Sequence, residues 1–99
     1  MSNEKIPNQL LVIRRKLGLT RKQVAAALGY ASASTIARHE QGRLVPPLHI
    51  LLQLEILYCM PVAYLYQDLY AELRSAIRRQ QAERRAAAQV TSPKEVAHA

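Results

Sequence analysis

Residues 19–42, LTRKQVAAALGYASASTIARHEQG, predict two short helices joined by a turn. Thr20 followed three residues later by Gln23 is a capping box, in which the hydroxyl accepts from a backbone N–H while the amide reaches back. Apolar residues then recur at helical spacing until Gly29, a residue that helix C-termini favour. A second start signal, Ser32 or Ser34, opens another helix that ends before Gly42.

Two short helices meeting at a glycine-containing turn form a helix-turn-helix unit, whose second helix is narrow enough to enter the major groove of DNA. That recognition helix is expected at about residues 32–41. The chain has 14 Lys and Arg against 7 Asp and Glu, a net charge of +7. Eight of the basic residues precede Leu44, whereas only two acidic residues, Glu4 and Glu40, do so. Positive charge on the half that carries the motif favours a polyanionic partner.

The composition also limits the class of protein. A chain of 99 residues can build one small core. Its single cysteine, Cys59, excludes an intramolecular disulfide and fits a reducing cytoplasm. The first ten residues lack the layout of a secretory signal. The longest apolar run, residues 48–66, is interrupted by polar residues and a proline, which predicts buried helices and no membrane contact. We therefore expect a cytoplasmic protein.

Helical spacing without strand alternation predicts an all-α fold. The first helix is expected at about residues 7–17, ending at Gly18. After the two helices of the motif, a double proline can begin a fourth helix over residues 48–58. Because its apolar residues cover more than one face, this helix is expected to be largely buried. A short fifth helix follows Pro61.

The composition changes after residue 66. Residues 67–90 are rich in Ala, Arg, Gln and Glu, which are strong helix formers. We expect a sixth, basic helix there, docked by its first half and projecting by its second. The predicted organisation is a helix-turn-helix domain over residues 1–66, the basic helix over 67–90 and a flexible tail over 91–99.

An apolar stripe follows one side of this sixth helix. Leu69, Leu73 and Ile77 lie four residues apart, with Tyr66 and Tyr70 beside them. The stripe is too short for a coiled coil. It is either part of the intramolecular core or a dimer interface, and the sequence leaves both interpretations open.

The order and spacing of these elements resemble the Cro/repressor-type helix-turn-helix family, also called the xenobiotic-response-element (XRE) family. The resemblance covers about residues 10–65 and rests on LTRKQVAAALGY, TIARHEQG, a proline linker, an apolar LxxLLxLxxL helix and MPVAYLY. It implies a five-helix repressor-like domain, to which this chain adds a C-terminal helix. It also implies a transcriptional regulator that binds operator DNA, usually as a dimer.

The resemblance implies roles for individual residues. Arg14 and Glu40 match a structural ion pair between the first and third helices. Arg21 matches the position where the chain first meets the DNA backbone, and Arg43 matches a phosphate contact. The implied DNA-binding residues are Arg21, Lys22, Ser32, Ala33, Ser34, Thr35, Arg38 and Arg43. Since the small side chains at 32–34 are poor bidentate base readers, base specificity is expected from Arg38 and Arg21.

Some positions depart from the family pattern. The turn between Gly29 and Thr35 is one residue longer than the commonest version. Cys59 stands where the family usually has Gly, so the end of the fourth helix is expected to differ there. His39 replaces a residue that is commonly aromatic or aliphatic, and we expect it to pack at the edge of the core.

No nucleophile–base pair, phosphate-binding glycine loop, carboxylate dyad or metal-ligand spacing is present in the sequence. Neither an enzyme nor a cofactor or metal site is therefore expected. The leading interpretation is a sequence-specific regulator that binds double-stranded DNA, and a homodimer is compatible with it.

Two other functions compete with this interpretation. One is a protein-interaction adaptor, such as an antitoxin or a polymerase-binding factor, whose partner docks on residues 67–90. The other is a single-stranded RNA binder, which is weaker because the chain has no Phe or Trp and its five Tyr form no stacking platform. A basic face around Arg21, Arg38 and Arg43 would favour DNA, whereas a basic patch confined to residues 74–85 would favour the adaptor.

Overall fold

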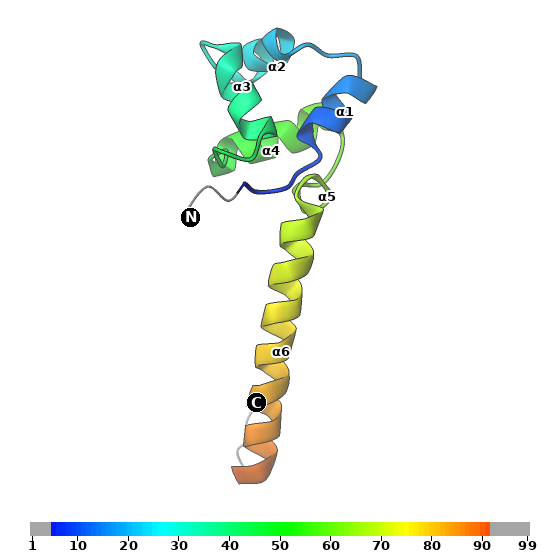
Figure 1. The fold of residues 1–99 in the computed structure, drawn as a ribbon. Helices are drawn as coiled ribbons and strands as arrows, with labels where there is room; N and C mark the ends of the chain where they lie inside the picture. The colour runs from blue at the N-terminus through cyan, green and yellow to red at the C-terminus, as the bar shows by residue number, and fades with distance from the viewer. Residues whose placement is uncertain (1–4, 92–99) are drawn as a thin grey trace.

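The computed structural model describes residues 5–91, and every regular element among them is an α-helix. The helices are α1 (Leu10–Lys16), α2 (Arg21–Leu28), α3 (Ala33–Glu40), α4 (Leu48–Tyr58), α5 (Val62–Leu65) and α6 (Gln67–Thr91). The predicted all-α fold with an additional C-terminal helix is confirmed. Figure 1 shows α1–α5 gathered into one domain and α6 leaving it as a long single helix. Apart from Thr91, the tail expected at 91–99 lies outside the described residues.

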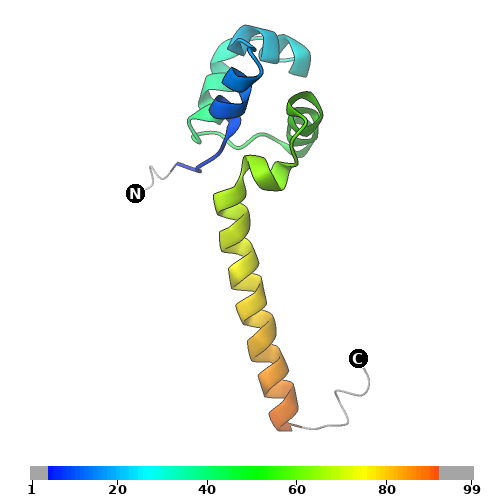
Figure 2. The ribbon, with the colours of Figure 1, turned by 90° about the vertical axis from the view of Figure 1, so that its right-hand side faces the viewer.

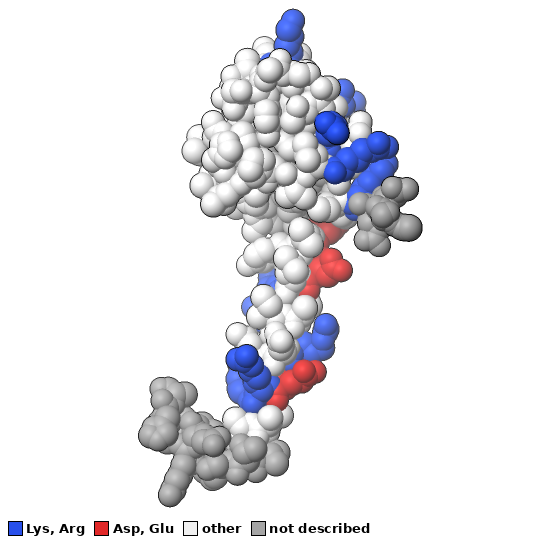
Figure 3. Space-filling model, turned by 90° about the vertical axis from the view of Figure 1, so that its left-hand side faces the viewer, with Lys and Arg blue, Asp and Glu red and all other residues white. Residues whose placement is uncertain are grey.

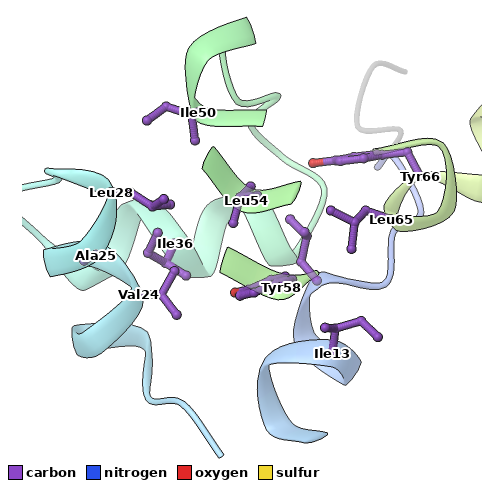
Figure 4. Close-up of a cluster of buried hydrophobic side chains, with 11 residues drawn as sticks. Ile13, Val24, Ala25, Leu28, Ile36, Ile50, Leu54, Tyr58, Leu65 and Tyr66 are labelled. Carbon is purple, nitrogen blue, oxygen red and sulfur yellow. The ribbon is translucent and has the colours of Figure 1, made fainter. Parts of the chain in front are cut away.

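The core lies between the five short helices (Figure 4). All five contribute to it, with Leu10, Ile13, Val24, Ala25, Leu28, Ile36, Ile50, Leu54, Tyr58 and Leu65, joined by Tyr66, the residue between α5 and α6. Val24 and Leu65 are completely buried. Each such aliphatic side chain stabilises the domain by about 1.5–3 kcal/mol relative to an exposed one. The helix-turn-helix unit thus rests on a continuous apolar support.

Residues 5–9, which precede α1, are not helical, so the prediction of a first helix from residue 7 is wrong. Hydrogen bonds to distant parts of the chain hold this segment. The N–H of Ile6 donates to the carbonyl of Gly42 (3.0 Å), and the N–H of Gln9 donates to that of Leu65 (2.8 Å). Asn8 then donates to the carbonyl of His39 and accepts from the N–H of Leu10, where α1 begins.

The ends of α2 and α3 follow the local sequence signals. Thr20 and Gln23 form the predicted capping box, with hydrogen bonds of 3.0 and 2.8 Å between side chain and backbone. Gly29 ends α2 in the left-handed conformation, at φ 82°. Of the two candidate serines, Ser32 is the N-cap of α3, since its hydroxyl accepts from the N–H of Ser34 (3.1 Å). The turn between the two helices is therefore bounded by the glycine that ends α2 and the serine that caps α3.

The helix α4 is half exposed, and the prediction that it is largely buried is wrong. Its buried face consists of Ile50, Leu54 and Tyr58. Leu48, Leu52 and Ile56 form a row on the opposite face, and Ile56 is 76% exposed. An all-round apolar pattern normally indicates burial on every side, but a domain of five short helices covers only one side of α4.

The end of α4 carries an unusual backbone conformation. Cys59 is its C-cap residue and adopts the left-handed region, at φ 56°. It is the only non-glycine residue with positive φ among residues 5–91. Glycine takes this conformation without steric cost, whereas a Cβ strains it. The end of α4 therefore has the backbone geometry that a glycine usually provides, although the residue there is a cysteine.

Only the beginning of α6 contacts the domain. Tyr66 is buried and Leu69 half buried, whereas Leu73 and Ile77 are each 53% exposed. The docked part is thus shorter than the predicted first half, and Figure 2 shows the rest projecting alone. The part of the molecule that the structure describes extends over 59 Å as a result. None of the helices within residues 5–91 combines the length and apolar character needed to cross a bilayer.

Candidate nucleic-acid interface

The helix α3 is amphipathic, with its polar side facing solvent. Ile36 and His39 point into the core. Ser34, Arg38 and Gln41 follow one another at spacings of four and three residues and are all exposed. Residues at these spacings lie above one another on one face of a helix. The result is a row of three polar side chains on the side of α3 that lies opposite the core.

His39 fixes the orientation of α3. Its side chain is completely buried, so the prediction that it packs at the core edge is wrong. Its Nδ1 lies 2.8 Å from the carbonyl oxygen of Leu44 and its Nε2 2.9 Å from the hydroxyl of Tyr30. Because a carbonyl cannot donate, Nδ1 carries the proton and, in the neutral ring, Nε2 accepts from the tyrosine. The histidine thus connects the turn before α3 to the linker after it.

Glu40 joins three helices through two arginines. Arg14 of α1 donates to both carboxylate oxygens of Glu40, and a third N–H of Arg14 donates to the carbonyl of Leu19 (2.9 Å). Arg21 of α2 donates to Glu40 Oε1 from its Nε (2.9 Å). The Glu40 side chain is only 2% exposed, whereas that of Arg21 is 43% exposed. The structure therefore brings Arg14 and Glu40 together and also holds Arg21 in a defined position beside α3.

Tyr58 lies close to this cluster. The pKa of its hydroxyl is raised to about 12, mainly by burial and also by the negative charge of Glu40, while the positive charge of Arg14 opposes the shift. The phenol therefore stays neutral over the physiological range.

The exposed charge on this part of the molecule is of one sign. Glu40 is the only acidic residue between residues 5 and 54, and it is buried and paired. The exposed basic side chains over the same range are Lys5, Arg15, Lys16, Arg21, Lys22, Arg38 and Arg43. Within the described residues, Arg38 and Arg43 form no ion pair. Figure 3 shows Lys and Arg gathered along one edge of the domain, beside a broad uncharged face.

The residues predicted for DNA binding occupy three neighbouring segments. Arg21 and Lys22 lie in the first turn of α2. Residues 32–35 form the N-cap and first turn of α3, Arg38 lies further along α3, and Arg43 follows it. Of these residues, Ala33 and Thr35 are half buried and the others are exposed. The hydroxyls of Ser32 and Ser34 lie 2.8 Å apart and take part in the cap.

Sequence reasoning did not include Gln41 among the candidate residues. It lies three residues after Arg38 on the exposed row of α3, and its amide offers both a donor and an acceptor. The helical spacing of 34, 38 and 41 was the signal that could have identified it.

A family model described as a helix-turn-helix domain matches residues 9–63. The match covers more than half of the chain, from the residue before α1 into α5, and the chain therefore belongs to the helix-turn-helix family. The helix α6 lies outside the matched range. No curated protein matches the chain. Within the described residues, no three His, Cys, Asp or Glu side chains are grouped in a way that could hold a metal ion.

Proposed function

We propose that this protein is a sequence-specific transcriptional regulator of the Cro/repressor type, which inserts α3 into the major groove of double-stranded DNA. The observation that carries the proposal is the exposed basic surface around α2 and α3, whose single carboxylate is buried between two arginines. Such a surface attracts a polyanion without an acidic group to repel it. Because this charge is not confined to residues 74–85, it favours DNA over the adaptor function.

The exposed row of α3 suits contacts to bases. An arginine can bind the two acceptors of guanine, and a glutamine can bind adenine through its amide. Arg38 and Gln41 are the long polar side chains of the row, whereas Ser34 is short. We therefore assign base contacts to Arg38 and Gln41. The small residues 32–35 allow the helix to approach the groove floor closely.

The residues around α3 suit contacts to phosphates. Lys22 lies in the first turn of α2, where backbone N–H groups point out of the helix end and attract anions. Arg43 follows α3 and is exposed. Arg21 is held by Glu40 through its Nε, while 43% of its side chain remains exposed to solvent. These three residues would position α3 on the duplex and carry little sequence information themselves.

A single recognition helix spans only a few base pairs, which is too little for a selective operator. Two copies related by a two-fold axis would contact half-sites about one helical turn apart, roughly 34 Å. We therefore propose that the protein binds DNA as a homodimer.

The salt dependence of binding to a random-sequence duplex tests the phosphate contacts. The logarithm of the affinity should fall linearly with the logarithm of salt concentration, with a slope of about −0.9 for each neutralised phosphate. Arg43→Ala should weaken binding to all duplexes similarly and reduce the slope by about 0.9 per protomer.

Arg79→Ala is the matched control, because Arg79 is an equally exposed arginine on α6. It should leave the slope unchanged. Affinity that does not depend on salt, absence of duplex binding at low salt, or equal effects of the two variants would contradict the proposal.

A further inference from the structure

The segment that precedes α1 is attached to the C-terminal end of α3. In Figure 1 this segment, residues 5–9, is the dark blue stretch that passes the end of α3. The N–H of Ile6 donates to the carbonyl of Gly42 (3.0 Å), and the side-chain amide of Asn8 donates to the carbonyl of His39 (3.1 Å). Both contacts join residues that are far apart in the sequence. The start of the described chain therefore lies beside the turn that follows α3.

Gly42 allows the two backbones to approach each other at this crossing. It is buried and has a φ of 77°. A Cβ at this position would overlap the carbonyl oxygen of Ile6 and would lie 2.7 Å from its nitrogen. The positive φ and the close approach thus both require glycine. Because Ile6 lies directly against Gly42, their chain neighbours Lys5 and Arg43 are brought to the same part of the surface.

Asn8 holds the segment in this arrangement. Its amide nitrogen donates to the carbonyls of Ile6 and His39, at 3.1 Å each, and its oxygen accepts from the N–H of Leu10 (3.0 Å). An asparagine side chain offers two donors and one acceptor group, and here both kinds are used within the chain. Asn8 therefore connects the segment to the end of α3 and to the start of α1.

The two side chains brought together here carry the same charge. Lys5 and Arg43 are both exposed, and neither forms an ion pair within the described residues. Glu40 precedes them on α3 but is buried between two arginines. Two like charges on one part of a surface repel each other, and an anion from outside the chain offsets that repulsion.

We infer that Lys5 is a phosphate contact of the DNA interface, which binds the DNA backbone beside Arg43 and is positioned by Asn8 and Gly42. The inference rests on the proposed function, to which the contact of Arg43 belongs. It adds a residue from outside the range of the helix-turn-helix family model, which begins at residue 9. Phosphate contacts position a protein on the duplex without reading its sequence. Lys5 therefore strengthens binding to every duplex.

The salt dependence of binding to a random-sequence duplex gives the first test. Lys5→Ala should reduce the slope of the logarithm of affinity against the logarithm of salt by about 0.9 per protomer. Arg79→Ala on α6 is the control and should leave the slope unchanged. If Arg43→Ala reduces the slope and Lys5→Ala does not, the inference is overturned and the proposed function stands. Absence of duplex binding by the wild-type protein would overturn both.

Glu4 requires a control of its own. It precedes Lys5 in the sequence and lies outside the described residues. Lys5→Ala removes the positive charge next to this acid, which by itself would weaken binding to a polyanion. The effect of Lys5→Ala on the slope is therefore measured in the wild type and in a Glu4→Gln background. The two changes should be equal. Loss of the effect in the Glu4→Gln background would overturn the phosphate contact.

An Asn8→Ala background tests the positioning. There Lys5→Ala should change the slope much less than in the wild type, because Lys5 is no longer held beside Arg43. Arg43→Ala should keep its full effect, since the N–H of Arg43 donates to the carbonyl of Arg38 (3.0 Å) and not to the segment. Circular dichroism checks that the helical content is unchanged. An undiminished effect of Lys5→Ala, or equal reduction of both effects, would overturn the positioning role of Asn8.

A cleavage probe at residue 5 locates the contact on the DNA. In a Cys59→Ser background, which removes the exposed native thiol, Lys5→Cys is coupled to iron–EDTA. This probe should cut the backbone of the bound duplex at a defined position in each half-site. The same probe on Gln80→Cys should not cut it, because Gln80 lies on the exposed part of α6, remote from α2 and α3 (Figure 1). Absence of cutting from residue 5 in the bound complex would overturn the inference.

Discussion

The α1–α5 domain and α6 are both helical and both basic, yet different forces position them. In the domain, long-range backbone hydrogen bonds, two helix caps and the Glu40 cluster fix where each helix lies. In α6, helix-forming residues fix the local structure, while only the first turn is anchored by burial. The domain is therefore a support for α3 that contacts within the chain hold in place, whereas most of α6 is exposed to solvent.

The largest expected difference between the two regions concerns a buried carboxylate. Glu40→Ala leaves Arg14 buried without its partner and should destabilise the domain by about 3–5 kcal/mol. Glu83→Ala, on the exposed part of α6, should change the unfolding free energy by less than about 1 kcal/mol. Urea denaturation followed by circular dichroism measures both variants. Equal changes in the unfolding free energy of the two variants would show that the Glu40 cluster does not stabilise the domain.

A smaller difference is expected at alkaline pH. The pKa of Tyr58 is raised to about 12 in the folded domain, mainly by burial, against about 10 in the unfolded chain. The folded state thus keeps a proton that the unfolded state loses, so stability is retained below pH 10 and lost as pH rises towards 12. The loss from this residue amounts to at most about 2–3 kcal/mol.

Thermal denaturation between pH 9 and pH 11.5 measures this effect. Tyr58→Phe should flatten the fall in midpoint temperature with pH, because the titrating hydroxyl is removed. Tyr70→Phe is the matched variant on α6, where the ring is half exposed, and should leave the profile as in the wild type. Similar dependences of the midpoint temperature on pH for the two variants would contradict the conclusion that Tyr58 is buried and Tyr70 half exposed.

The smallest effect is expected at the end of α4. Cys59→Gly should stabilise the domain by about 0.5–1 kcal/mol, because glycine relieves the strain at φ 56°. The greater flexibility that glycine gives the unfolded chain limits this gain. Cys59→Ala keeps a Cβ at the same position and should give no gain. The two variants can be compared by urea denaturation under reducing conditions, and equal stabilities would argue against backbone strain.

The sequence predicts the parts of the fold that local signals determine. The capping box at Thr20, the glycine that ends α2 and the order of helices are all visible in short stretches of sequence. The family model confirms the helix-turn-helix assignment over residues 9–63. The contact between Arg14 and Glu40 is present in the structure, but the roles of the exposed residues in DNA binding stay predictions.

The errors fall where distant contacts decide the structure. Pro7 can begin a helix, but residues 6–9 are not helical and instead form hydrogen bonds to Gly42, His39 and Leu65. The apolar residues of α4 predict burial, but a small domain covers only one of its faces. His39 is buried because Tyr30 and Leu44 supply partners for both ring nitrogens. None of these partners is evident from sequence spacing.

We propose above all that α3 recognises base sequence through its exposed row, with Arg38 in the major groove. The most direct test is to select bound duplexes from a random pool with the wild-type protein. The affinities of wild type and Arg38→Ala for the selected duplex and for a scrambled one are then compared. Arg38→Ala should lower the preference for the selected duplex by about 1–3 kcal/mol and leave the scrambled duplex much less affected. A pool that yields no preferred sequence, or equal losses on both duplexes, would contradict the claim.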